Sequence, residues 1–596
     1  MEPSFAARVL LALLFGLGTS ALAQAEAIFP LAEVAPGQQG HGLTAGPGNV
    51  LERFSVEILA VQDDMGPGFP LILIRTGGDF IERAGGVAAG MSGSPIYIAG
   101  RLLGALAYAF PQSDHRLALV TPAEIIVATD PSAALPQPGS QEVMREVMRE
   151  VVYEGESLGP AAAVRTPVLV TGLSARAAEE LQRLFEGGLF RGDILPLQAG
   201  RMSAQGDEDY HVEPGSAVSV QLVRGDVSLA AVGTVTRVDD ARVWAFGHPL
   251  VERGAVSFAL SPAYISHIVP SSSLPFKLAN SGRRLLGVIN QDRPHGVSGV
   301  LGRTPVFIPV SLVFDGPEGS SEKQFEVTSD ERFYAPLVFA ASLQTIDEAL
   351  EQLGDGTAEL AWEIALAGGR TLRLLEQTAD SSDIAASAAL LAAAPLEVLA
   401  DNVFAAPGVK SIKLTVRYDR ERRVASVVRA VAENDTLRPG DTLLAHVRLQ
   451  PFRGEARLET VRVPIPEEAA GPLEITFRGG LEASPEEAAG GENAPLTFGE
   501  LIAALEGRVQ ASELVAEAFV NGDYRQLARV RLPFLVEGYE SLTVHVLGAD
   551  EEAEPQPAPE PAEEERLPLP PQAPEPELPP PPAPLPDSPR GSRGGR

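Results

Sequence analysis

The sequence predicts a mainly β protein that is built from several units. Its 596 residues exceed what one hydrophobic core usually supports, and a typical unit of about 150 residues suggests about four units. Hydrophobic residues make up 45% of the chain and aromatic residues only 6%, while there are 58 glycines and 51 prolines. This composition is sufficient for buried cores and favours short strands joined by tight turns.

The first 25 residues have the pattern of a secretory signal peptide. Arg8 precedes an apolar run at residues 9–15, and Ala-x-Ala cleavage sites follow at residues 21–23 and 23–25. The apolar run is short for a membrane span, although an uncleaved anchor is the alternative. We therefore expect an exported protein, in the periplasm, the cell envelope or the extracellular space, with no integral membrane span in the mature chain.

Charge and composition exclude several classes of function. The net charge of −32 and the lack of a basic stripe argue against a nucleic-acid partner. The absence of cysteine excludes disulfides, thiol catalysis, zinc–thiolate sites and lipoprotein attachment. No His-Glu-x-x-His motif and no phosphate-binding loop is present, so we expect neither a metal nor another cofactor.

The chain divides into segments of different patterning. Two segments with glycine-punctuated strands, which we expect to be half-barrels, flank a mixed α/β segment that starts with a short linker helix at residues 141–150. The predicted units are residues 26–135 (first half-barrel), 136–214 (linker helix and mixed segment), 215–332 (second half-barrel), 333–400 (helical, α+β), 401–548 (β-rich and sandwich-like, with a helical patch at 501–518) and 549–596. The last is a Pro/Glu-rich, disordered tail, either a solvated spacer or a docking peptide.

One hexapeptide has the features of a serine nucleophile loop. Residues 90–95 read Gly-Met-Ser-Gly-Ser-Pro and lie between a glycine-rich approach and a predicted strand. Glycines on both sides of Ser92 permit a turn that presents the hydroxyl beside backbone N–H groups. The loop resembles the serine loop of trypsin-like double-barrel proteases, in which the N–H groups of Gly90 and Ser92 would form the oxyanion hole. A plain glycine turn between strands is the alternative.

A general base must accompany the serine, and the eight histidines make the search short. His248 is the best candidate, because it directly follows the apolar strand at residues 243–246 and precedes a proline. His41 is the second candidate for the base, followed by His115 and His295.

At both candidate sites the sequence resembles the SpoIVB family of sporulation serine peptidases. Residues 56–124 are similar to the serine half of that family, and residues 233–248 with 287–299 are similar to its histidine half. The resemblance implies that Ser92 is the nucleophile and His248 the base. The two halves stand in the opposite order from the family, which a circular permutation would explain.

The sequence does not decide which residue is the third member of a catalytic triad. Where the family pattern would place an acid upstream of the serine, this chain has Gly77, and Asp79 follows two positions later. Asp79 is the candidate, and a dyad without an acid is a further possibility. The alternatives are Asp239 and Asp240, which are near His248 in the sequence, and Asp292.

These observations predict a permuted, chymotrypsin-like double half-barrel, followed by α+β and β-sandwich-like units and the tail. Its function would be that of an exported serine endopeptidase, with acyl transfer from a protein or peptide substrate to Ser92 followed by hydrolysis. The alternative is a catalytically inactive envelope scaffold or protein-binding module that retains the fold.

Overall fold

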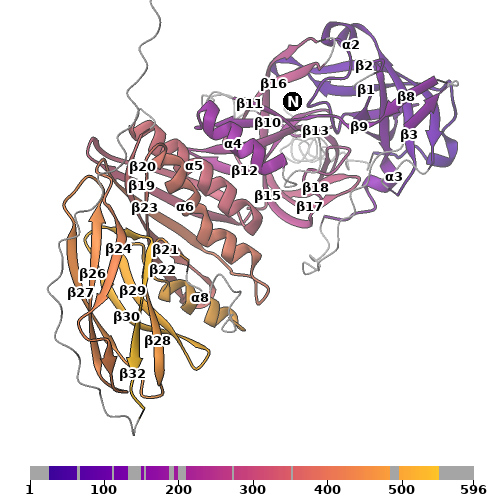
Figure 1. Ribbon diagram of the computed structural model, residues 1–596. Helices are drawn as coiled ribbons and strands as arrows, with labels where there is room; N and C mark the ends of the chain where they lie inside the picture. Colours follow the sequence, from indigo (N-terminus) through magenta and orange to yellow (C-terminus); the bar gives the residue numbers. More distant parts are fainter. Residues whose placement is uncertain are drawn as a thin grey trace, which may run out of the picture.

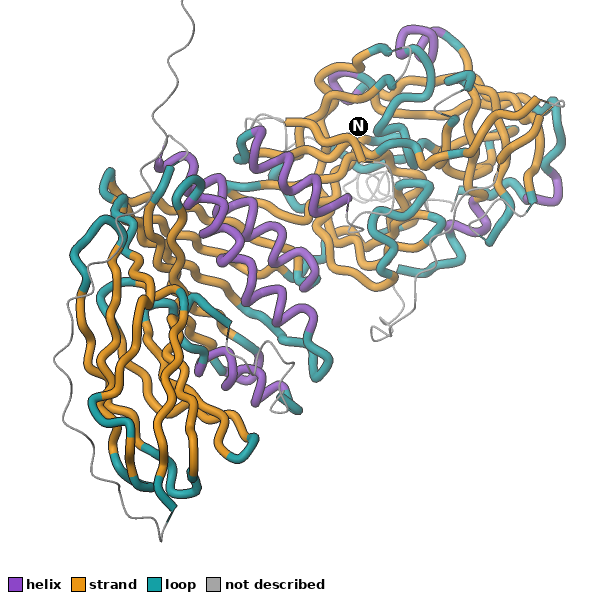
Figure 2. The backbone as a smooth tube through the Cα atoms, viewed as in Figure 1, coloured by secondary structure: helices purple, strands orange, loops and turns teal. Residues whose placement is uncertain are grey.

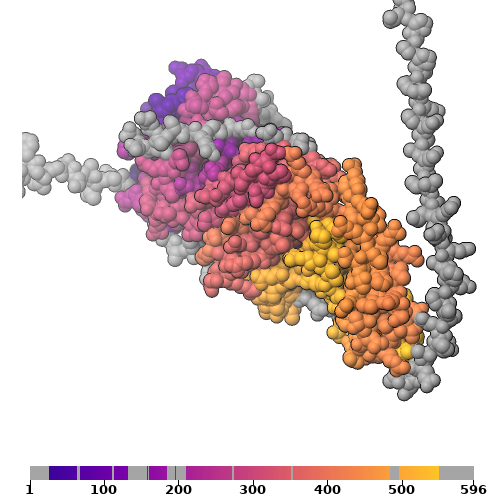
Figure 3. All heavy atoms as spheres, turned by 90° about the vertical axis from the view of Figure 1, so that its left-hand side faces the viewer, coloured from indigo at the N-terminus to yellow at the C-terminus, as the bar shows by residue number. Residues whose placement is uncertain are grey.

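The computed structural model describes residues 26–63, 68–110, 113–131, 150–153, 156–186, 194–198, 210–271, 274–350, 354–483 and 495–548. The predicted signal peptide, the linker helix apart from Glu150, and the predicted tail lie outside these residues. Strands run through the whole described chain and helices are few, which confirms the mainly β prediction (Figure 2). The molecule is elongated, with the N-terminal strands at one end and the C-terminal strands at the other (Figures 1 and 3).

The first unit is a closed six-stranded barrel, called the first barrel below. Its strands follow the order β4-β1-β2-β3-β6-β5, and pairing of β4 with β5 closes the ring. Alternate residues of β2, Phe54, Val56 and Ile58, point into its core. Its elements are β1 (Gln39–Ala45), β2 (Leu51–Gln62), β3 (Leu71–Gly77), α2 (Asp79–Ala84), β4 (Pro95–Ile98), β5 (Arg101–Ala109), β6 (Leu117–Pro122) and α3 (Ala123–Ile126).

A connecting region leads from the first barrel to the second. Within it, β9 adds to the edge of β5, and β10 pairs with β13 of the second barrel. Its elements are β7 (Glu150–Tyr153), β8 (Glu156–Pro160), β9 (Ala162–Ala163), β10 (Thr166–Thr171), α4 (Ala175–Glu186) and β11 (Ile194–Gln198). The predicted strand at 167–170 and helix at 175–185 are confirmed as β10 and α4.

The second barrel repeats the strand order of the first. Its ring is β12-β13-β14-β18-β17-β15, closed by pairing of β12 with β13, so each barrel follows the order 1-2-3-6-5-4 when its ring strands are numbered along the chain. The elements are β12 (Ala217–Gly225), β13 (Ser228–Asp239), β14 (Arg242–Ala245), β15 (Gly254–Val269), β16 (Phe276–Ser281), β17 (Gly287–Arg293) and β18 (Gly296–Leu301). Strand β16 pairs with β15 outside the ring.

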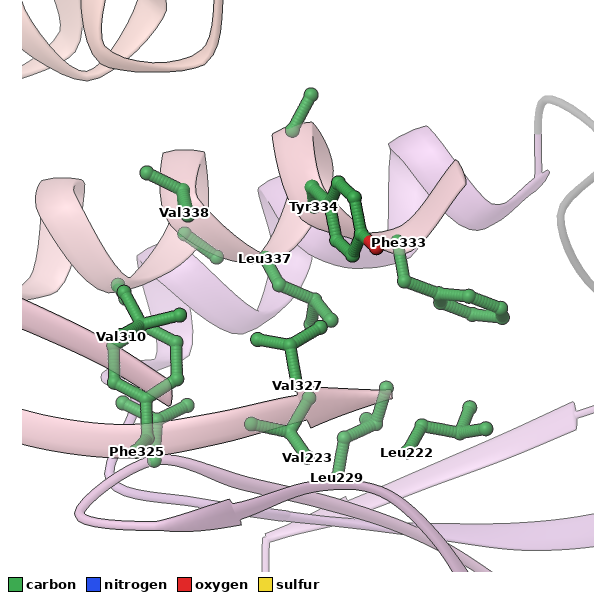
Figure 4. Packing of buried hydrophobic residues seen from close by; sticks show 14 of the residues in the cluster. Leu222, Val223, Leu229, Val310, Phe325, Val327, Phe333, Tyr334, Leu337 and Val338 are labelled. Carbon is green, nitrogen blue, oxygen red and sulfur yellow. The ribbon is translucent and has the colours of Figure 1, made fainter. Parts of the chain in front are cut away.

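Next to the second barrel lies a sheet with helices packed on one face. Its strand order is β20-β19-β23-β21-β22, and β20 also pairs with β12. Figure 4 shows Leu337 of α5 over Val327 of β20 and Val223 of β12, so one core joins the barrel and this layer. The elements are β19 (Phe307–Gly316), β20 (Gly319–Thr328), α5 (Tyr334–Leu350), β21 (Gly356–Ala365), β22 (Thr371–Asp380), α6 (Ile384–Asp401) and β23 (Ser411–Asp419).

Helix α6 is the one helix of the described chain with the length and composition of a membrane span, and half of it is buried within the protein.

The last unit is a β-sandwich, the type of fold expected here, and its strands lie within residues 424–546, since β23 at 411–419 belongs to the helix-covered sheet. A four-stranded sheet (β27-β26-β24-β31) faces a five-stranded one (β25-β32-β28-β29-β30), and their inner side chains form a separate core. The elements are β24 (Val424–Ala432), β25 (Thr436–Leu437), β26 (Thr442–Pro451), β27 (Arg457–Pro464), β28 (Gly471–Gly479), β29 (Glu513–Val520), β30 (Asp523–Arg531), β31 (Leu535–Glu537) and β32 (Tyr539–Val546). Helix α8 (Phe498–Gly507) precedes β29 in the chain but packs on β22, where Ile502 and Leu505 join the core of the helix-covered sheet.

Candidate active site

The serine loop, residues 85–94, connects α2 to β4 and is fully buried around Ser92. Gly90 (φ +90°) and Gly93 (φ +92°) adopt backbone conformations that favour glycine, and the N–H of Ser94 donates to the carbonyl of Met91 at 2.9 Å. The Met91 side chain fills the barrel core. The glycines therefore shape this loop as predicted, and the Met91 side chain anchors it to the core of the first barrel.

The second barrel holds the same loop from the other side. The N–H of Thr234 donates to the carbonyl of Ser92 at 2.8 Å, and its hydroxyl donates to the carbonyl of Gly90 at 3.0 Å. The backbones are so close that a Cβ atom added at Gly93 would lie 2.0 Å from the carbonyl oxygen of Thr234. The serine loop is thus part of the junction between the barrels.

The histidine loop, residues 246–253, connects β14 to β15 and reaches Ser92. Gly247 N–H donates to Ser92 Oγ at 3.3 Å across a sequence separation of 155 residues, and His248 is the next residue. Phe246, just before it, has a left-handed backbone (φ +55°) that turns the chain toward the serine. The fold therefore brings together the two motifs that were singled out in the sequence.

Both ring nitrogens of His248 lie against carbonyl oxygens. Nδ1 is 2.8 Å from the oxygen of Pro249, and Nε2 is 3.2 Å from that of Val164. A neutral imidazole carries one N–H, so only the charged form donates to both oxygens. The ring is fully buried between Tyr108 and Phe246, with ring centroids 6.3 Å away in each case. For Nε2 to accept a proton from Ser92, the carbonyl of Val164 must move away.

Residues 161–166 close the site, and we call them the covering segment. The N–H of Val164 donates to the carbonyl of Ala107 at 2.8 Å, which extends the pairing of β9 with the end of β5. The next carbonyl, that of Arg165, accepts from the N–H of Gly90 at 3.1 Å. The covering segment therefore engages both the ring of the candidate base and one of the two N–H groups predicted for the oxyanion hole.

The candidate acids occupy different environments. Asp79 is exposed as the first residue of α2, and Asp240 is exposed in a turn. Asp239 is paired with Arg242 at 2.6 Å. Asp292, at the end of β17, is fully buried, and its carboxylate accepts three backbone N–H groups of the histidine loop, those of Leu250, Val251 and Glu252, at 2.7–2.9 Å.

Burial raises the pKa of Asp292 to about 6, although the three N–H groups act in the opposite direction. Asp292 was one of three alternatives to Asp79 in the sequence. The structure shows that Asp292, unlike Asp79, holds the loop that carries His248.

The other candidate histidines lie at separate places. His41 stacks on Tyr97 with ring centroids 5.2 Å apart, and the carbonyl of His115 accepts from the N–H of Val87. His295 Nε2 is 2.9 Å from Thr129 Oγ1, and burial lowers the pKa of His295 to about 4.

Sequence reasoning missed one buried charged residue beside the serine loop. Lys277 of β16 is fully buried, and its Cδ lies 3.3 Å from the position that a Cβ would take at Gly90. In the sequence it stands between Phe276 and Leu278 in a strand, with no motif around it. Successive side chains of a strand point to opposite faces, so a lysine between two apolar residues is normally expected to face solvent. The local sequence therefore does not indicate that Lys277 is buried.

A groove of about 820 Å³ lies elsewhere, between the second barrel and strands β19, β20 and β23. Its lining includes Arg224, Gln324 and Lys413 and contains neither Ser92 nor His248. The groove is therefore separate from the candidate active site.

Comparison with known proteins supports the serine half of this site. Residues 22–116, which contain the serine loop, match the model of the SpoIVB peptidase S55 family. This match is consistent with the resemblance of the serine half to that family, while the histidine half at residues 233–299 lies outside the matched segment. No curated protein and no solved structure matches the chain.

Replacing Asp292 with alanine is expected to destabilise the second barrel by about 3 kcal/mol, because three buried N–H groups lose their acceptor. This corresponds to a fall of roughly 10 °C in the melting temperature of a unit of this size, measurable by calorimetry. Asp79→Ala, at the exposed first residue of α2, is the control and should change the melting temperature little. Equal effects of the two substitutions would contradict the role assigned to the Asp292 carboxylate.

Proposed function

We propose that the chain is an exported serine endopeptidase of the SpoIVB type, with Ser92 as nucleophile and His248 as base. The observation that carries the proposal is the meeting of the two loops, in which the residue before His248 donates to Ser92 Oγ from another barrel. The peptidase family match over the serine loop supports a protein or peptide substrate. The identical strand order of the two closed barrels supports a chymotrypsin-like pair of barrels, and the permuted order of the serine and histidine halves is part of the proposal.

In the proposed reaction, His248 Nε2 takes the proton of Ser92 Oγ as the oxygen attacks the scissile carbonyl carbon. The N–H groups of Gly90 and Ser92 stabilise the oxyanion, and the proton passes to the leaving amine. Water then hydrolyses the acyl-enzyme with His248 again as base. Asp292 is the positioning acid of this proposal, since it fixes the histidine loop, while exposed Asp79 has the less favourable location.

The covering segment must move before this reaction can start. Ser92 and His248 are fully buried, and the carbonyls of Val164 and Arg165 occupy their surroundings. The same observation supports the second candidate function, an inactive envelope scaffold in which the segment fills the site permanently. A chemical probe of the serine separates the two.

A fluorophosphonate probe is expected to label the mature protein at Ser92. Ser92→Ala should abolish labelling, and His248→Ala should slow it at least 100-fold, as for loss of a general base. Ser113→Ala and His267→Ala, outside the two loops, are the matched controls and should label like the wild type. Labelling that survives in Ser92→Ala would contradict the proposal. No labelling of either the wild type or Val164→Lys, a substitution expected to displace the covering segment, would favour the scaffold.

A further inference from the structure

Lys277 reaches the serine loop from the second barrel. Strand β16 leaves the ring and lies against the first barrel, where the N–H of Lys277 donates to the carbonyl of Ala89 at 3.0 Å and the N–H of Ala89 to the carbonyl of Pro275 at 2.8 Å. The lysine side chain then runs along Gly90 into the interior, where it is fully buried.

The ammonium group of Lys277 is connected to the serine loop on both sides of Ser92. Nζ donates to the hydroxyl of Thr44 at 2.7 Å and to that of Thr234 at 3.4 Å. Thr44 Oγ1 also accepts from the hydroxyl of Ser94 at 3.0 Å, and Thr234 Oγ1 donates to the carbonyl of Gly90 at 3.0 Å. Gly90 and Ser94 are the residues two positions before and two positions after Ser92.

A buried lysine without a carboxylate partner is expected to lower the stability of the protein. The side-chain hydrogen bonds that the described chain gives to Lys277 Nζ go to threonine hydroxyls, and burial is the single cause that lowers its pKa to about 7. The elements packed around it are β1, β13, β15, β10 and the serine loop, and the residues that they place beside it, Thr44, Thr234, Ile268, Pro167 and Gly90, are uncharged. His267 of β15, next to Ile268, is exposed and pairs with Leu278. A methionine would fill the same space without desolvating a charge, so the lysine is not explained by packing.

We infer that Lys277 is a positioning residue for the Ser92 site, which it organises by holding Gly90 and Ser94 through Thr234 and Thr44. Its hydrogen bonds go to the two threonines, and its role is therefore to fix the loop geometry and the direction of the Gly90 N–H. Fixed hydrogen-bond donors at the oxyanion position contribute a large part of the transition-state stabilisation in acyl transfer. The inference rests on the proposed function of Ser92.

The test compares Lys277→Met with the wild type in stability and in labelling by the fluorophosphonate. Lys277→Met is expected to melt at or above the wild-type temperature at pH 7, yet to label at least tenfold more slowly. The phosphorus NMR resonance of the phosphonylated serine should also shift, because the phosphonyl oxygen sits in the oxyanion hole. Lys413→Met, at an exposed position of β23, is the matched control and should change none of these.

Stability as a function of pH gives a further readout. The folded-state pKa of Lys277 is about 7 and its ordinary value is 10.5, so between these values the unfolded chain binds more protons than the folded one. Wild-type stability should therefore rise with pH across this window relative to Lys277→Met. Thr44→Val, which removes the link to Ser94 and keeps the lysine, should slow labelling while retaining this rise.

The outcomes distinguish the inference from the function on which it rests. If Lys277→Met labels at the wild-type rate with an unshifted resonance, the lysine has no positioning role and the proposed function stands. If the wild type and Val164→Lys both fail to label, the proposed function and the inference are both wrong. If Lys277→Met does not fold, Thr44→Val decides, and an unchanged labelling rate in that variant would overturn the inference.

Discussion

Val164→Lys is expected to label with a fluorophosphonate at least tenfold faster than the wild type. Val164 is only 3% exposed in the covering segment, and its carbonyl lies against His248. An unpaired lysine at this position costs several kcal/mol when buried, so the segment is driven out of the site into water. Ser92 and His248 then become accessible. The rate of labelling, followed on a gel at constant pH, measures the effect directly.

The matched control for this prediction is Ala162→Lys on the same segment. Ala162 pairs with Ala109 on β5 but is only partly buried, so a lysine there can reach solvent and leave the segment in place. Equal labelling rates of Val164→Lys, Ala162→Lys and the wild type would show that the covering segment does not control access to the serine.

Gly93→Ala is expected to separate the two barrels at the serine loop and to lower stability by about 3 kcal/mol or more. The added Cβ would lie 2.0 Å from the carbonyl oxygen of Thr234 and 2.5 Å from the nitrogen of Phe246, both rigid backbone atoms. The backbone at Gly93 also has a φ of +92°, which alanine tolerates poorly. Calorimetry and limited proteolysis measure the loss.

Gly100→Ala isolates the effect of the clash. Gly100 has a similar positive φ of +75°, but an added Cβ there meets nothing within 4 Å. It should therefore show only the backbone cost, about 1 kcal/mol. If Gly93→Ala were no more destabilising than Gly100→Ala, the close contact with Thr234 would not be part of what holds the barrels together.

Much of the fold could be predicted from local patterns. Alternation and glycine turns identified strands such as β10, β13 and β14, and apolar periodicity identified α4. The helical patch expected at 501–518 is only half correct, since α8 ends at Gly507 and residues 513–520 form β29. The hydrophobic run there fits either period, and the pairing of β29 with β28 and β30 decides in favour of a strand.

The pairing of strands that are far apart in the chain could not be predicted from the sequence. Strand β23 lies in parallel beside β19, about 100 residues earlier in the chain, and joins the helix-covered sheet although it precedes the sandwich directly. Local patterning shows that residues 411–419 form a strand but not which partner they find, because pairing depends on surfaces that form only in the folded chain.

The candidate site, too, could be predicted from the sequence only in part. Ser92 and His248 stand in distinctive local motifs, and both could be named from the sequence. Asp292 could be named only as one of several acids, because its distinguishing property is burial against the N–H groups of the histidine loop. Lys277 and the covering segment gave no local signal, since their contacts with Gly90 and His248 exist only after the barrels pack.

The order of the two barrels also has a consequence for biosynthesis. A ribosome makes the serine loop first, and the histidine loop, which contacts it, follows 155 residues later. At about 15 residues per second, a nascent chain carries Ser92 for roughly ten seconds before His248 exists. Under the proposed function, the incomplete chain lacks its base during this interval, and the peptidase site forms only when the second barrel has been completed and has docked.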